Sequence, residues 1–148
     1  LTDIQAALAI GQLHKLDKNN EKRRLNAEIF RDLLQDTDIQ FQCTDNATEH
    51  SYFYLTGLLP KNLSDQRDKF LNLVKSFGAP IKKLYPLALT EITLLRDKVN
   101  QGCPIAQDIT KRMFNVYVNP GLNREDIEFM AKALKKAYEI IKANSNHR

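Results

Sequence analysis

The chain has 148 residues, of which 27% are charged and 43% hydrophobic, and its formal net charge is +4. This length and balance are typical of one soluble globular domain, and two cysteines are too few for a secreted disulfide scaffold. The longest uncharged runs, 4–13 and 51–60, fall short of the ~20 apolar residues that cross a bilayer, so we expect no membrane span.

The chain opens on a capping box. The Thr2 hydroxyl can accept the N–H of Gln5, while the Gln5 side chain reaches back to the backbone of Thr2. Apolar residues then keep helical spacing to about Leu34, which predicts one long helix with a bend near Asn19 and Asn20. The first half of this helix is rich in alanine and nearly uncharged, as expected of a helix that packs closely on another body.

Two strands are predicted next. Residues 39–43 alternate apolar and polar side chains, and residues 51–59 are rich in aromatic and β-branched residues. In the second strand, Tyr52 and Tyr54 would share one face of the sheet and Phe53 would lie on the other. We expect these rings to pack in the core or in an interface.

A helix with an N-cap at Ser64 is predicted to follow, and Gly78 is a natural residue just beyond its end. The segment 81–85 has a proline on either side. Proline removes a backbone donor, so this segment is expected at the edge of a sheet or in a loop.

The last third of the chain contains four further predicted elements and a tail. They are helices over 90–99 and 104–113, a strand over 114–118, a closing helix that Asn123 and Asp126 cap, and a frayed tail over 143–148. This order predicts an α+β fold: a small, mostly antiparallel sheet with helices packed on one face, preceded by a long helix.

Few local motifs point to chemistry. The five glycines form neither a G-x-G-x-x-G loop nor a P-loop, and the three histidines lack metal-ligand spacing. Basic residues have acidic neighbours, which favours solvated helix faces over a nucleic-acid surface. Cys43 and Cys103 are expected to be small buried hydrophobes, and His50 a partly exposed turn residue. We therefore expect no metal site, no nucleic-acid partner and a cytoplasmic location.

Segments along nearly the whole chain are similar to one known family. They are 1–8, 12–13, 15–17, 21–24, 26–27, 51–59, 78–80, 85–86, 103–104 with Ala106, 119–122 and 125–127. Through them the chain closely resembles the DegT/DnrJ/EryC1/StrS family of pyridoxal-phosphate-dependent sugar aminotransferases. The opening block is the most specific part of the resemblance.

The resemblance implies a C-terminal small domain over 38–148 of a fold-type I aminotransferase. Residues 1–37 would then be a long helix leading from an N-terminal large domain. Such enzymes act as homodimers and transfer an amino group from an amino acid, usually glutamate, to a nucleotide-linked keto sugar for polysaccharide, lipopolysaccharide or antibiotic sugar biosynthesis. The family's Schiff-base lysine and cofactor contacts lie upstream of Leu1, so we expect no catalytic or cofactor-binding residue here. The chain alone should be inactive and bind no pyridoxal phosphate.

Tyr85 is the one residue that the resemblance suggests as substrate-facing; packing beside Pro86 is the alternative. Leu84 stands where the family often has histidine, and the last strand departs from the usual Leu-Pro-Leu. Lys82 and Lys83 could attract a diphosphate, but neighbours on an extended segment point to opposite faces, so at most one would contribute.

Two other functions remain open from the sequence. Some family members have a histidine in place of the lysine and dehydrate the sugar. A different class of protein would be an interaction module that keeps the small-domain fold, binds no cofactor and pairs through its first helix.

Overall fold

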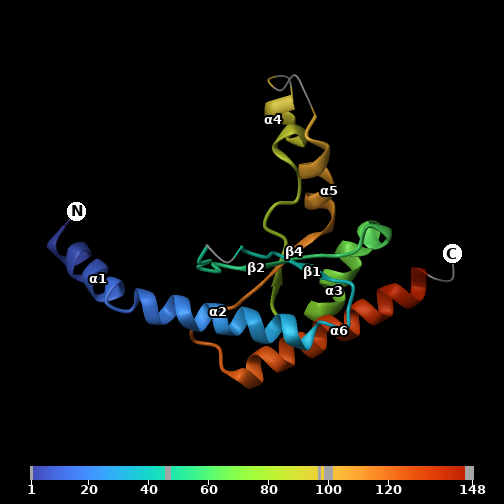
Figure 1. Cartoon of the computed structure of the whole chain (residues 1–148). Helices are drawn as coiled ribbons and strands as arrows, with labels where there is room; N and C mark the ends of the chain where they lie inside the picture. Colours follow the sequence, from blue (N-terminus) through green and yellow to red (C-terminus); the bar gives the residue numbers. More distant parts are fainter. Residues whose placement is uncertain (1, 46–47, 97, 99–101, 146–148) are drawn as a thin grey trace.

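A computed structural model describes residues 2–45, 48–96, 98 and 102–145 of the chain (Figure 1). Its elements confirm the predicted α+β class. In chain order they are α1 (Asp3–Leu13), α2 (Leu16–Leu33), β1 (Gln40–Phe41), β2 (Leu55–Leu58), the 3-10 turn η1 (Lys61–Gln66), α3 (Arg67–Ser76), β3 (Ile81–Lys82), the 3-10 turn η2 (Leu89–Glu91), α4 (Thr93–Arg96), α5 (Pro104–Arg112), β4 (Met113–Val116) and α6 (Arg124–Ser145).

The four strands form one antiparallel sheet in the order β1-β2-β4-β3. As predicted, β3 is an edge strand. Helices α2, α3 and α6 lie on one side of the sheet, whereas α4 and α5 form an arm that projects from the other side (Figure 1). The sheet therefore has an inner face under the three helices and an outer face toward the arm.

Aromatic rings from three elements fill the centre of the core. Phe30 of α2, Phe70 of α3 and Phe114 of β4 are fully buried. The rings of Phe70 and Phe114 lie 5.0 Å apart between centroids. Opposite Phe114 in the β2–β4 register stands Gly57, and a Cβ at Gly57 would come within 2.8 Å of Cε2 of Phe114. Because Gly57 has no side chain, the ring of Phe114 on β4 has room beside it.

The predicted helix ends are largely confirmed. Asn123 Oδ1 accepts the N–H of Asp126 at 2.8 Å, and Asp126 Oδ2 accepts the N–H of Asn123 at 2.9 Å, so a capping box starts α6. Gly78 has a φ of +84° just after α3. Its own N–H and that of Ala79 bond to carbonyls of the last turn, at Lys75 and Val74, which is the Schellman arrangement. Helix α5 begins at Pro104, as predicted.

The long first helix is interrupted at a different place from the predicted one. The break lies at His14 and Lys15, where the Lys15 N–H bonds to the Gln12 carbonyl in a tighter turn. Asn19 and Asn20, the predicted bend, lie inside α2. There Asn20 Oδ1 accepts a bond from Arg23 one turn later, so the side chain supports the helix instead of breaking it.

The second predicted strand is shorter than 51–59, and the prediction that Tyr52 and Tyr54 share a strand face is wrong. Pairing starts only at Leu55, because side chains hold the preceding backbone. Tyr52 has a φ of +42°, and its N–H bonds to Nδ1 of His50 at 2.8 Å. Its buried phenol bonds to Arg31, and Phe53 is exposed.

Three smaller predictions also fail. Ser64 does not cap a helix, because η1 has already begun after Pro60, whose carbonyl accepts the Leu63 N–H at 2.9 Å. Cys43 and Cys103 are exposed rather than buried: Cys43 follows the short strand β1, and Cys103 is the N-cap residue of α5.

The ends of two predicted helices differ as well. Helix α6 continues into the predicted frayed tail as far as Ser145, whose hydroxyl bonds to the Ile141 carbonyl, while 146–148 lie outside the described residues. Of the helix predicted over 90–99, the structure has only η2 and α4; residues 97 and 99 are not described.

Substituting Gly57 tests the central packing contact. Gly57→Ala should lower the free energy of unfolding by about 1–3 kcal/mol, because its Cβ would force the buried Phe114 ring to move. Urea denaturation measures this loss. Gly102→Ala is the control, since a Cβ there has nothing within 4 Å. Equal stability of the two variants would contradict the proposed contact.

Candidate functional site

The outer face of the sheet carries the polar side chains of the strands. Strand residues alternate between faces, so the core positions of β4 leave Asn115 on the outer face. The register places Thr56 of β2 and Lys82 of β3 on either side of Asn115. These three residues, with Tyr54 and Tyr117 beyond the strand ends, make up the candidate site.

The ammonium group of Lys82 lies beside two tyrosine rings that contact each other. Its Nζ is 5.8 Å from the ring centroid of Tyr54 and 5.6 Å from that of Tyr117, and the two rings meet edge to face at 5.3 Å. Hydrogen bonding to Tyr117, and then to Tyr54, raises the pKa of Lys82 above its usual 10.5. The ammonium group is therefore held in its charged form at an exposed position. We call Lys82, Tyr54 and Tyr117 the lysine cluster.

Asn115 holds the backbone beside this cluster. It is buried, and its Nδ2 donates to Oγ1 of Thr56 at 2.9 Å. Its Oδ1 accepts the N–H of Leu84 at 3.4 Å, which fixes the segment just before Tyr85. The Tyr85 side chain is 62% exposed, so the structure presents it to solvent. Its role toward a substrate stays a prediction.

Lys83 points away from the lysine cluster, in agreement with the predicted divergence of the pair. Its Nζ contacts Oδ1 of Asp68 on α3 at 3.1 Å and Oδ2 at 3.3 Å. The Lys83 ammonium, followed by Arg67, holds the pKa of Asp68 below its usual value. Lys83 thus forms an ion pair within the fold, whereas Lys82 faces solvent on the outer side.

Tyr117 and Asn115 were not recognised as site residues from the sequence. Strand alternation alone would have placed 115 and 117 on one face of the last strand. Their nearness to Lys82, however, depends on β3 pairing with β4, and two edge residues give no sequence signal for that pairing.

The described residues do not fit a pyridoxal phosphate site. A Schiff-base lysine must become neutral to attack the cofactor aldehyde, which requires a desolvated amine or a neighbouring cation. No lysine in the described ranges is buried. Hydrogen bonds to tyrosine or aspartate side chains raise the pKa values of Lys82, Lys135 and Lys142 above the usual 10.5. Each of these amines is therefore held protonated.

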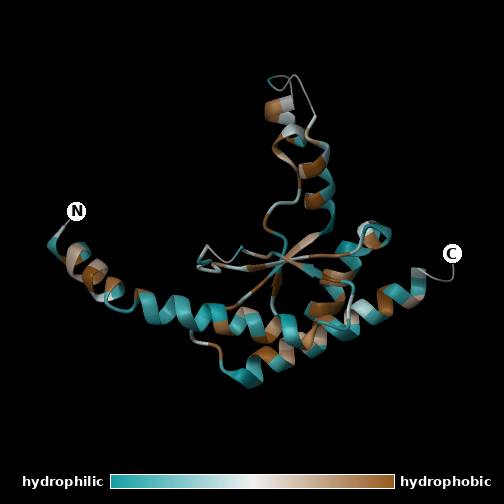
Figure 2. Ribbon diagram, viewed as in Figure 1, coloured by the Kyte–Doolittle hydropathy of each residue, from teal (hydrophilic) through white to brown (hydrophobic). Residues whose placement is uncertain are grey.

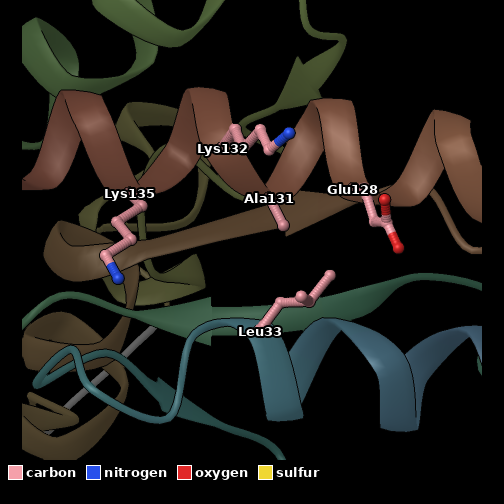
Figure 3. A pocket seen from close by; sticks show the side chains of 5 residues that line it. All are labelled: Leu33, Glu128, Ala131, Lys132 and Lys135. Atoms are coloured by element: carbon pink, nitrogen blue, oxygen red, sulfur yellow. The ribbon is translucent and has the colours of Figure 1, made fainter.

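A groove of about 280 Å³ between α2 and α6 is a weaker candidate (Figure 3). Leu33 of α2 faces Ala131 of α6 across it, with Glu128, Lys132 and Lys135 around them. Its lining is mainly apolar, and Lys135 is already paired with Asp36. Glu128 is likewise paired with Arg124, and the lining residues include no serine or cysteine as a nucleophile.

The described part of the chain has neither a cluster of metal ligands nor a helix that could cross a membrane. No three or more histidine, cysteine, aspartate or glutamate side chains there come together as metal ligands. None of the described helices combines the length and the apolar character that a bilayer crossing needs.

Comparison with known proteins gives a family match. Residues 1–135 match the DegT/DnrJ/EryC1/StrS aminotransferase family. GDP-perosamine synthase from Vibrio cholerae is 23% identical over 141 residues, covering 95% of this chain and 38% of that protein. L-glutamine:2-deoxy-scyllo-inosose aminotransferase from Micromonospora echinospora is 27% identical over 166 residues, covering 100% of this chain and 38% of that protein.

The fold is shared with solved structures. The PMP-form of Spr1654 from Streptococcus pneumoniae matches with a TM-score of 0.89 at 16% identity, over 99% of this chain and 37% of that one. At this identity the match concerns the fold. The chain spans about 38% of the length of the curated relatives that it matches.

Replacing Tyr117 tests the geometry of the lysine cluster. Tyr117→Phe removes the oxygen that contributes most to the raised pKa of Lys82, so this pKa should fall toward 10.5. Carbon-detected NMR titration of the lysine Cε resonances measures the shift. Tyr85→Phe is the matched control and should leave Lys82 unchanged. An unaltered Lys82 pKa in Tyr117→Phe would show that the two side chains do not interact in solution.

Proposed function

The chain belongs to the DegT/DnrJ/EryC1/StrS aminotransferase family, and on that basis we propose that it is the C-terminal part of a sugar aminotransferase. The parent enzyme would use pyridoxal phosphate to move an amino group from glutamate to a nucleotide-linked keto sugar. The family match over residues 1–135 is the observation that carries this proposal. The names of two relatives, GDP-perosamine synthase and L-glutamine:2-deoxy-scyllo-inosose aminotransferase, support it.

The proposal divides the chain into two parts. Residues 38–148 form the small domain, and residues 1–37 lead to it from an N-terminal large domain. Helix α1 carries hydrophobic residues and extends away from the sheet (Figure 2). No residue of α1 is buried, and Ile4 and Leu8 are 75% and 65% exposed, which supports a connecting role for α1. Phe30 of α2, in contrast, is buried in the core of the small domain. A capped helix with uncovered apolar side chains suits packing against another body.

The cofactor would be held by the large domain. No lysine in the described part of this chain is buried, and the pKa values of Lys82, Lys135 and Lys142 are raised, so the chain alone would bind no cofactor and have no activity. The proposal also includes a cytoplasmic homodimer that serves polysaccharide, lipopolysaccharide or antibiotic sugar synthesis. Both glutamate and glutamine should be tried as donors, because one relative is named for glutamine.

Tyr85 is the proposed substrate contact of this chain. Its exposed ring follows a backbone segment that Asn115 and the β3–β4 pairing hold in place. A phenol at a fixed point can donate a hydrogen bond to a sugar hydroxyl or accept one from it.

Borohydride trapping tests the proposed function. Reduction of the full-length protein, followed by peptide mapping, should find the pyridoxyl group on a lysine outside residues 1–148. The 148-residue chain treated in the same way is the control and should remain unmodified. An adduct on a lysine of this chain would contradict the proposal, and cofactor binding without any adduct would favour the dehydratase. A reading frame that starts at Leu1 would favour the interaction module.

A substitution at Tyr85 tests the proposed contact in the full-length enzyme. Tyr85→Phe should raise KM for the sugar about fivefold to tenfold with kcat little changed, because one hydrogen bond to the bound substrate is lost. Steady-state kinetics with varied sugar and saturating amino donor measure this. The exposed Phe129→Leu on α6 is a control. An unchanged KM for Tyr85→Phe would leave Tyr85 without a substrate role.

A further inference from the structure

We propose that the surface of α3 and α6 around Phe129 is a docking site for an acidic segment of another protein. Apolar side chains of that segment would enter the hollows beside Phe129, and its carboxylates would meet Lys132 and Lys136. We call the residues that line the larger hollow the α6 groove: Phe77, Phe129, Lys132, Ala133 and Lys136. This inference goes beyond the proposed function and does not depend on it.

Phe129 is an exposed aromatic ring that has no role in the proposed function. It is 51% exposed, and within the described residues it is the one exposed large apolar side chain of α3 and α6. The others lie on α1 and α2, just before β2, or among the described residues between 85 and 109. A single exposed apolar residue is common on protein surfaces, so the groups around this ring decide its role.

Two shallow hollows share the ring of Phe129 as a wall. The α6 groove has a volume of about 270 Å³. The second hollow, of about 210 Å³, is lined by Pro80, Leu122, Asp126, Phe129 and Met130. The ring lies against the backbone of Gly78, where a Cβ would stand 3.5 Å from Cζ of Phe129. Adjoining apolar hollows on a helix surface suit successive side chains of a polypeptide, whereas a small molecule is typically enclosed in one pocket.

Lys132 and Lys136 give the α6 groove its positive charge. Neither forms an ion pair in the part of the chain that the structure describes, where the paired lysines are Lys83, Lys135 and Lys142. The Nζ of Lys136 lies 4.5 Å from the ring centroid of Phe77, so a cation–π contact holds this ammonium group over the apolar floor. An apolar floor beside two unpaired cations is complementary to a segment that carries both apolar and acidic side chains.

Three acidic residues of α6 already have contacts within the protein. Glu128 forms an ion pair with Arg124, and Asp126 belongs to the cap of the helix. The charge of Glu139 acts on Lys135 and helps to raise its pKa. The carboxylates that would balance the two lysines of the α6 groove must therefore come from a partner.

Charge and shape favour a protein partner over a second copy of this chain or a lipid surface. In a two-fold contact through the α6 groove, Lys132 and Lys136 would meet the same lysines of the other copy, and the chain already has a net charge of +4. Lipid-binding patches combine ~4–8 basic residues, whereas two lysines line this recessed groove. The groove lies on the helical side of the sheet, so a partner bound there would leave the outer face free (Figure 1).

Fluorescence anisotropy of the full-length protein tests the inference with three labelled helical peptides. The first has leucines on one face and glutamates elsewhere, the second has serines in place of the leucines, and the third has lysines in place of the glutamates. The first peptide alone should bind saturably. Lys136→Glu should weaken it about tenfold or more, because an attraction becomes a repulsion. Phe129→Ser should weaken it about fivefold or more, because the apolar contact is lost.

Lys111→Glu on α5 is the matched control for net charge. It makes the same change of charge on the other side of the sheet and should leave the affinity for the first peptide unchanged (Figure 1). Thermal unfolding of each variant checks that it is folded. Equal weakening by Lys111→Glu and Lys136→Glu would overturn the inference, since only net charge would then matter. Equal binding of the serine peptide, or no binding of the leucine peptide, would overturn it too.

Two further measurements identify the other possible occupants. Vesicles of phosphatidylcholine and phosphatidylserine are tested by co-sedimentation, and self-association by analytical ultracentrifugation. Vesicle binding that Lys136→Glu abolishes, without peptide binding, would assign the groove to a membrane surface and refute the inference. Self-association that Phe129→Ser abolishes, again without peptide binding, would assign it to a second copy and refute the inference as well.

Discussion

The contact of the Phe114 ring with the backbone of Gly57 is the constraint on which the rest of the structure depends. It allows β4 to lie directly beside β2 with a large ring between the sheet and α3. Because side chains alternate along a strand, placing Phe114 inward places Asn115 outward. The same contact therefore determines which side chains of β4 point into the core and which lie on the outer face.

The buried side chain of Asn115 holds together the backbone of the candidate site on the outer face of the sheet. A buried amide is costly unless its polar atoms are bonded, and both atoms of this side chain have partners, on β2 and on the segment after β3. These bonds join three strand segments at the point where the arm leaves the sheet. Fixed backbone on both sides gives Lys82 and Tyr85 defined positions without burying either one.

Sequence patterns correctly predicted the helix ends that depend on residues close together in the sequence. The box at Asn123 and Asp126, the glycine after α3 and the proline that starts α5 each act within a few residues, and the structure has them all. The boundary of β2 depends on distant groups, because Arg31 and His50 hold Tyr52 out of the sheet.

The candidate site follows the same division between local and distant causes. The opposite directions of Lys82 and Lys83 follow from strand alternation and were predictable. The meeting of Lys82 with Tyr117 was not, because it requires the register of two strands that are more than thirty residues apart in sequence. That register depends in turn on the position that the Phe114–Gly57 contact gives to β4. The arrangement of the candidate-site residues is therefore a consequence of core packing. Core packing can be predicted only in part from a single sequence.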